Sequence, residues 1–252
     1  MRKYAVMNAK GGVGKTTTTS NVAFGLAKLG WRTVVVDLDT QGQMSIGLGV
    51  SCEAGISELA LGQVELAEAM TQVRDNLWLL AGGRGLASLQ QDIARRDMAS
   101  ERVLSEALAG IEEQDLADVV LVDTAPSWSN LNVNCLFYVD QVILPVNMET
   151  LSLHGVVDFV RSVEGVQKYR EGVEISMVVP TFYDGRTKKS LEILGQLKSY
   201  FGEDKVVDPI RSNVKLSEAA GQGVSIFDYA PKSNGAKDYA GLIQRLVADL
   251  GA

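Results

Sequence analysis

The chain has 252 residues, 46% of them apolar and 22% charged, with a formal net charge of −7 at pH 7. This size and composition suffice to bury one large α/β core, and no linker-like or low-complexity stretch divides the sequence, so we expect a single domain over residues 1–252. The acidic balance excludes a protein whose whole surface coats nucleic acid, and any contact with DNA must therefore be local.

The cysteine and histidine content excludes further classes of site. The chain has two cysteines, Cys52 and Cys135, and one histidine. The cysteines are too few and too far apart for a disulfide framework or a zinc site, and one histidine cannot supply two metal ligands. No apolar run approaches the ~20 residues that span a bilayer, and the first residues lead into a short strand rather than a signal peptide. We expect a cytoplasmic protein without a membrane anchor.

A phosphate-binding pattern lies between the first predicted strand and the first predicted helix. The strand is the bounded apolar run at residues 4–7, and the helix is expected over residues 17–29, where apolar side chains recur at near-helical spacing. The connecting residues read Asn8-Ala9-Lys10-Gly11-Gly12-Val13-Gly14-Lys15-Thr16-Thr17. A glycine-rich turn that joins a strand to a helix is typical of a nucleotide site.

The residue types of this turn suit phosphate chemistry. Glycines let the backbone N–H groups approach phosphate oxygens without Cβ clashes, and the helix N-terminus adds the positive end of its dipole. Lys15 brings charge to the β- and γ-phosphates, and the Thr16 hydroxyl is placed to bind Mg²⁺. We therefore expect ATP and Mg²⁺ as ligands. The predicted nucleotide-binding residues are Lys10, Gly11, Gly12, Val13, Gly14, Lys15, Thr16 and Thr17.

Lys10 distinguishes this turn from the standard pattern, which has glycine where this chain has Ala9. A lysine directly before paired glycines is the mark of the deviant Walker A ATPases, the ParA/MinD superfamily, and the segment resembles theirs. The resemblance implies a homodimer that forms with ATP, in which Lys10 reaches across the interface to the nucleotide of the other subunit. Lys10 and Lys15 are accordingly expected to act in catalysis.

The second predicted strand, residues 32–37, ends in two aspartates. The segment from Asp37 to Gln43 resembles the ParA segment whose second aspartate positions the attacking water, which implies that Asp39 is the hydrolytic residue. A carboxylate beside the γ-phosphate can orient water in line, and phosphoryl transfer depends mainly on such positioning. Asp37 either points to the opposite side of the strand or supports the metal shell.

Three further strands complete the predicted architecture. They cover residues 119–122, 141–146 and 174–180, and the first of them ends in Asp123, the setting of a carboxylate that holds Mg²⁺. Residues 61–113 read as mostly helical, interrupted at residues 76–80 and by a glycine-rich turn at residues 82–85. Strands that alternate with helices predict an α/β fold with a doubly wound, mostly parallel sheet, helices on both faces and ligands at the carboxyl ends of the strands.

The resemblance to ParA proteins continues through the last third of the chain. Residues 181–188 and 213–219 look like two ParA segments that carry basic residues for DNA binding without sequence preference, and the matching positions are Arg186 and Lys215. Charge alone also suggests Lys188, Lys189, Lys198 and Arg211. From charge alone, residues 186–189 read as the solvated first turn of a helix, and only the resemblance to ParA proteins favours DNA binding.

Other branches of the superfamily need features that this sequence lacks. A MinD-like membrane switch needs a basic amphipathic tail, whereas residues 242–250 have a packing stripe and are expected to dock on the core. Neither cysteine lies in the context of an iron–sulfur ligand. No N-terminal helix-turn-helix domain is expected, which argues against operator binding.

Two functions remain open at this point. The first is an ATP-dependent switch that dimerises on ATP, binds nonspecific DNA over the nucleoid, and positions a cargo when a ParB-like or other adaptor stimulates slow ATP hydrolysis. The cargo would be a plasmid, a chromosome or a protein body. The second is a nucleotide-dependent regulator that recruits a protein and does not use DNA.

Overall fold

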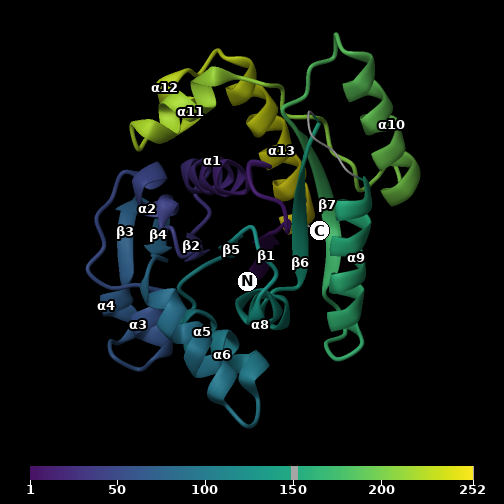
Figure 1. Cartoon of the computed structure of the whole chain (residues 1–252). Helices are drawn as coiled ribbons and strands as arrows, with labels where there is room; N and C mark the ends of the chain where they lie inside the picture. The colour runs from purple at the N-terminus through teal and green to yellow at the C-terminus, as the bar shows by residue number, and fades with distance from the viewer. Residues whose placement is uncertain (149–152, 252) are drawn as a thin grey trace.

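The computed structural model describes residues 1–148 and 153–251, and its described residues form one seven-stranded sheet with helices on both faces (Figure 1). The strand order is β3-β4-β2-β5-β1-β6-β7. The strands are β1 (Arg2–Val6), β2 (Thr33–Leu38), β3 (Met70–Arg74), β4 (Leu77–Leu80), β5 (Val119–Thr124), β6 (Gln141–Asn147) and β7 (Glu174–Thr181).

Neighbouring strands run parallel except for the pair β3 and β4. The helices between them are α1 (Lys15–Lys28), α2 (Gln43–Leu48), α3 (Ile56–Ala60), α4 (Leu66–Ala69), α5 (Gly85–Arg95), the short 3₁₀ helix η1 (Ser100–Arg102), α6 (Val103–Ala107), α7 (Ala109–Glu113), α8 (Asn130–Tyr138), α9 (Leu153–Gln167), α10 (Lys188–Phe201), α11 (Val214–Gly221), α12 (Ile226–Tyr229) and α13 (Asn234–Leu250).

The sheet divides the interior into two apolar cores. One core lies between the sheet and helices α1, α2, α11, α12 and α13. The other lies between the sheet and helices α3, α5, α6, α7, α8, α9 and α10. Strands β2 and β5 are buried along their whole length, which explains why their sequences are continuous apolar runs rather than alternating ones. The prediction of a doubly wound, mostly parallel sheet is confirmed.

The segment from residue 61 to residue 113 differs from its prediction. It holds the half-buried edge strand β3 as well as β4, and β3 runs antiparallel to its neighbour with a register shift between Gln72 and Arg74. The tail prediction is confirmed, because Leu242, Ile243 and Leu246 of α13 are buried against the sheet. Among the described residues, every helix is too short or too polar to cross a bilayer.

The register of the central strands creates the site. Val6 of β1 and Asp37 of β2 both pair with Asp123 of β5. The carboxyl ends of these three adjacent strands therefore lie at one edge of the sheet, directly below the turn that leads from β1 into α1.

Candidate functional site

The glycine-rich turn contains two residues in the left-handed backbone conformation, which favours glycine. Gly12 and Gly14 have φ values of 68° and 86°, and Gly14 is the N-cap of α1. No side chain caps the first turn of α1. Backbone N–H groups at the start of a 14-residue helix therefore face the loop, the arrangement that binds phosphate.

Lys15 lies inside this loop rather than in solvent. Its side chain is buried, and its Nζ donates a 2.9 Å hydrogen bond to the carbonyl oxygen of Lys10. Burial lowers the pKa of Lys15, while the carboxylates of Asp123 and Asp39 act in the opposite direction. The ammonium group is thus held at the centre of the loop, where a phosphate would meet it.

Asn8 fixes the start of the loop. Its Oδ1 accepts a 2.9 Å hydrogen bond from the Lys10 N–H, and its Nδ2 donates over 2.8 Å to the carbonyl oxygen of Pro145 in β6. From the far side, the Thr181 hydroxyl of β7 donates over 2.9 Å to the carbonyl of Val13. The loop is therefore tied to two strands besides β1. These hydrogen bonds could not be predicted from sequence patterns, since they join side chains and carbonyl groups that are distant along the chain.

Asp123 and Thr16, the two predicted metal ligands, are in direct contact. The Thr16 hydroxyl donates to one carboxylate oxygen of Asp123 over 2.7 Å, and the Thr19 hydroxyl donates to the other over 3.0 Å. Burial raises the pKa of Asp123 to about 6, and the two threonine hydrogen bonds act against that rise. Thr19 is an addition to the predicted site, and it lies one helical turn after Thr16 on the same face of α1.

This donor set fits magnesium that is carried in by a nucleotide. Carboxylate and hydroxyl oxygens are ligands that Mg²⁺ prefers, with water and phosphate completing its octahedron. The described part of the chain holds no cluster of three His, Cys, Asp or Glu side chains that could bind a metal alone. Thr16 and Asp123 would hold the ion, which would supply positive charge that balances the phosphate groups.

Asp37 lies on the same side of the sheet as Asp123. The two residues are paired in the strand register, and the Asp37 side chain is 1% exposed. Burial, followed by repulsion from Asp123, raises the pKa of Asp37 to about 7. Of the two placements that the sequence left open, Asp37 takes the one beside the metal ligands.

Asp39 stands at the rim of the same site, partly exposed. Its Oδ1 accepts a 2.9 Å hydrogen bond from the Gln41 N–H, and its own N–H donates to Asp37 over 2.9 Å. The turn at residues 82–85 packs against this segment. The Gly83 N–H donates a hydrogen bond to the Asp39 carbonyl oxygen, and a Cβ atom on Gly82 would lie 2.6 Å from the Asp37 carbonyl oxygen. From the sequence, this turn was only a break between helices.

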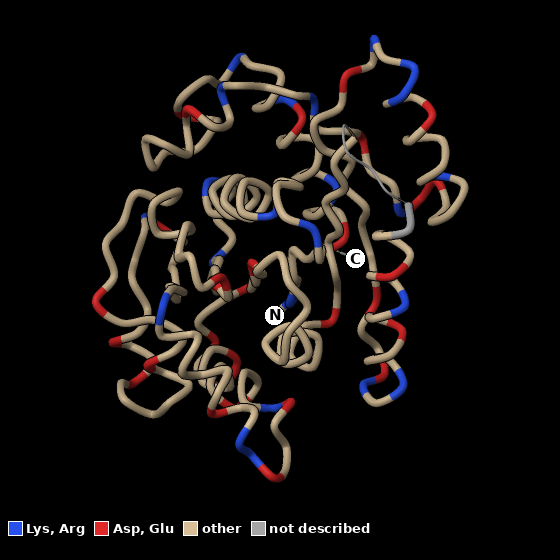
Figure 2. The backbone as a smooth tube through the Cα atoms, in the orientation of Figure 1, with Lys and Arg blue, Asp and Glu red and all other residues tan. Residues whose placement is uncertain are grey.

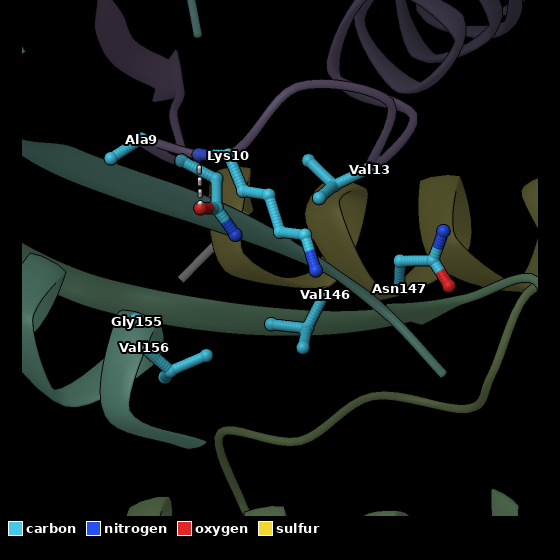
Figure 3. Close-up of a pocket in the computed structure, with 8 residues that line it drawn as sticks. Ala9, Lys10, Val13, Val146, Asn147, Gly155 and Val156 are labelled. Carbon is cyan, nitrogen blue, oxygen red and sulfur yellow. Dashed lines mark hydrogen bonds between the residues drawn. The ribbon is translucent and has the colours of Figure 1, made fainter. Parts of the chain in front are cut away.

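Lys10 borders a cavity of about 290 Å³ between the loop, the end of β6 and the start of α9. Figure 3 shows its side chain extending from the loop toward Val146 and Asn147. Asn147 in turn donates to the Gly12 carbonyl over 3.3 Å. Lys10 is therefore exposed on the opposite side of the loop from α1, whereas Lys15 points inward.

A second cavity of about 290 Å³ lies behind the loop, against Gly14 and Thr17 at the start of α1. The sequence did not identify it. Phe182, with a φ of 53°, lines it together with residues 210–214, 216 and 217. Tyr239 forms part of the lining, and its hydroxyl lies 3.2 Å from that of Thr18. A group bound to the loop through phosphate could extend a flat ring into this space.

The two predicted DNA-binding residues are engaged by carboxylates of the chain. Arg186 forms two hydrogen bonds with Asp184, of 2.9 and 2.8 Å, in the exposed turn before α10. Lys215, in the first turn of α11, binds Glu218 over 2.7 Å. Basic residues gather around the start of α10, next to the acidic Asp184 (Figure 2).

The loops that carry these residues meet behind the site. Tyr183 and Arg211 form a parallel bridge, and Ser212 N–H donates to the Tyr183 carbonyl over 3.1 Å. Arg211 itself is held by Asp238 over 2.6 Å. The segments after β7 and before α11, both identified in the sequence, are therefore neighbours on the upper side of the sheet in Figure 1.

Comparisons with known proteins show the family of this chain. A family model described as an AAA domain matches residues 1–175. The chromosome-partitioning ATPase Soj of Thermus thermophilus is 36% identical over 249 residues, which cover 98% of this chain and 96% of that protein. The sporulation initiation inhibitor protein Soj of Bacillus subtilis is 31% identical over 250 residues, which cover 97% of this chain and 98% of that one.

Solved structures share the fold over the whole chain. A Mycobacterium smegmatis protein described as cobyrinic acid a,c-diamide synthase, with bound ADP and magnesium, is similar with a TM-score of 0.86 and 30% identity, covering 100% of this chain and 96% of that one. The septum site-determining protein MinD of Pyrococcus horikoshii, complexed with Mg-ADP, has a TM-score of 0.81 at 21% identity and covers 100% and 98%. The second likeness concerns the fold alone.

Proposed function

Since the chain belongs to the ParA/MinD-type family of P-loop ATPases, we propose that it is an ATP-dependent positioning switch formed by a single domain over residues 1–252. Its ligands are ATP and Mg²⁺. The observation that carries this proposal is the contact of Thr16 with Asp123 beside the buried Lys15. It brings the oxygens that would hold a metal next to a positive charge that would bind phosphate.

In this proposal each group of residues in the site has a separate role in ATP hydrolysis. Backbone N–H groups of residues 11–17 hold the phosphates, and Lys15 balances the charge of the β- and γ-oxygens. Thr16 and Asp123 hold the metal, and Asp39 orients a water molecule in line with the γ-phosphate. The ring of the nucleotide lies in the cavity beside Phe182.

Lys10 would complete the site of a second copy. Its exposed position supports this role, and its side chain would turn away from Val146 and Asn147, toward which it extends in Figure 3, to reach the other subunit. Two copies that face each other across their loops would enclose two nucleotides, and ATP would thereby control dimerisation. Hydrolysis would be slow until an adaptor protein, ParB-like or other, completes the site.

The dimer would bind DNA through Arg186 and Lys215, without reading sequence, and would therefore associate with the nucleoid. The proximity of the two segments through the Tyr183–Arg211 bridge supports one continuous contact surface. The cargo would be a chromosome, a plasmid or a protein body.

A second candidate is a regulator that recruits a protein and does not use DNA. The ion pairs of Arg186 with Asp184 and of Lys215 with Glu218 favour it, since both cations already have an anion, and so does the net charge of −7.

Binding to a nonspecific duplex separates the two candidates. It would be measured without nucleotide, with ADP and with ATP, at low and moderate salt, for the wild type and for Arg186→Ala/Lys215→Ala. A Lys28→Ala/Lys232→Ala variant is the control for loss of two positive charges. Binding that needs ATP, weakens with salt and is lost only in the first variant would support the DNA-bound switch. Absence of binding in every state would favour the regulator.

A further inference from the structure

Two glycines from distant parts of the sequence, Gly49 and Gly223, pack backbone against backbone. A Cβ atom added to Gly223 would lie 2.5 Å from the Cα of Gly49 and 2.9 Å from its nitrogen. A Cβ atom added to Gly49 would lie 2.6 Å from the carbonyl oxygen of Gly223. Real Cβ atoms essentially never approach within 3.0 Å of another heavy atom, so any side chain at either position must push the two segments apart.

Each glycine ends a helix in the left-handed conformation. Gly49 has a φ of 72° and closes α2 with a 3.1 Å hydrogen bond from its N–H to the Ile46 carbonyl. Gly223 has a φ of 65°, and its N–H bonds to the carbonyl of Ala220 over 3.1 Å just beyond α11. Both backbones are therefore fixed by their own helices, and the contact joins the carboxyl ends of α2 and α11.

Helix α2 connects this contact to the hydrolytic aspartate. Its Met44 N–H points to the Asp37 carboxylate at 3.4 Å, and Gly42 N–H donates to the Asp39 carbonyl over 3.0 Å. The helix has only six residues, about 9 Å of length, and ends at Gly49. A displacement of the Asp39 loop would therefore move Gly49 as well, because the short helix α2 connects them.

Helix α11 connects the same contact to Lys215. Asn213 caps the helix by accepting a 3.0 Å hydrogen bond from the Lys215 N–H. Asn213 and Leu216 also line the cavity behind the phosphate loop. The helix thus lines the proposed ring pocket at one end and contacts α2 at the other, with Lys215 in its first turn.

We propose that the Gly49–Gly223 contact transmits the state of the Asp39 loop to α11, so that the bound nucleotide decides where Lys215 is presented. The inference deepens the proposed function and rests on it for the role of Lys215. Two backbones in contact without intervening side chains cannot absorb a small shift by rotamer changes, so movement at one is passed to the other.

The main test is Gly223→Ala, with two matched controls. Gly221→Ala adds the same methyl group to the end of α11 where nothing lies within 4 Å of it. Gly30→Ala adds it at a φ of 92° in open space, and so reproduces the backbone strain without the clash. For each protein, the affinity for ATP, the affinity for ADP and the affinity for a nonspecific duplex with each nucleotide would be measured.

The expected result is specific to the coupling. Gly223→Ala should bind both nucleotides within about twofold of wild type, while the ratio of DNA affinity with ATP to that with ADP falls at least about tenfold, in the range of typical coupling energies. Both controls should keep the wild-type ratio. A folded Gly223→Ala protein with an unchanged ratio would overturn the inference.

Hydrogen exchange on the wild type keeps the inference testable if Gly223→Ala does not fold. Residues 43–50 and 214–224 should change protection together when ADP is replaced by ATP. A change in one segment without the other would overturn the link. Failure of the proposed function would give a different result, because DNA binding by the wild type would then not depend on nucleotide. Hydrogen exchange measures the coupling between α2 and α11 without DNA, so it tests the inference separately.

Discussion

Thr16 at the start of α1 and Asp123 at the end of β5 are joined by a 2.7 Å hydrogen bond. The donor and the acceptor are 107 residues apart in sequence. The contact brings together the two oxygens that are proposed to hold Mg²⁺. The parts of the proposed site can be tested one by one.

Thr16→Ala should lose magnesium-dependent nucleotide binding, with affinity for Mg-ATP falling roughly 10- to 100-fold, because the hydroxyl ligand and the partner of Asp123 both disappear. Thr16→Ser keeps the hydroxyl and should restore most of the affinity. Titration calorimetry with and without Mg²⁺ would measure both variants. Equal losses in the alanine and serine variants would argue against a metal-binding role.

Asp39→Ala should bind ATP with near-wild-type affinity and still dimerise, but its turnover should fall by about 100-fold or more, since the positioned water is lost. Release of phosphate in single-turnover experiments would measure this. Asp97→Ala, at an exposed position away from the site, is the control. Unchanged turnover in Asp39→Ala would remove this residue from the mechanism.

Lys10→Ala should separate nucleotide binding from dimerisation. Lys15 remains in the loop, so ATP affinity should fall only a few-fold, whereas the ATP-dependent dimer should weaken by tenfold or more through loss of a charge pair across the interface. Sedimentation velocity with ADP and with a slowly hydrolysed ATP analogue would measure the dimer, with Lys28→Ala as the control. A dimer of wild-type strength would place Lys10 outside the interface.

Asp37→Asn should stabilise the nucleotide-free protein at alkaline pH. The pKa of Asp37 rises from 3.8 to about 7 on folding, so its favourable contribution is complete below pH 3.8 and is lost as the pH rises through about 7. Asparagine has no charge to desolvate. We expect a gain of roughly 1 to 2 kcal/mol at pH 8.5, about 3 to 6 °C in Tm, and a much smaller gain at pH 5. An equal gain at both pH values would contradict this origin.

The central strands and the phosphate loop were predictable because their signals are local. Buried parallel strands are continuous apolar runs, and Asp123 follows such a run directly. Strand β3 was not predicted, because a half-buried edge strand has neither a continuous run nor a clear alternation. The distinction matters for function, since Asp39 and Asp123 lie at or just after the ends of such buried parallel strands.

Contacts between distant segments could not be predicted. Nothing in the residues around Phe182 shows that residues 210–214, 216 and 217 line the same cavity. Gly49 and Gly223 each read as an ordinary helix end, because a glycine that follows a helix needs no further explanation. Their mutual contact follows only from the way α2 and α11 pack on α1 and the sheet.

The carboxylates that hold Arg186 and Lys215 have a consequence for how long a DNA-bound state would last. A phosphate that approaches either cation competes with Asp184 or Glu218 for it, so the neighbouring carboxylate offsets part of the attraction and the net gain per contact is small. When the DNA leaves, the same carboxylates are in place to take the cations back. Residence on DNA would thus be brief unless several contacts act together, and the proposed positioning switch would be released from DNA readily.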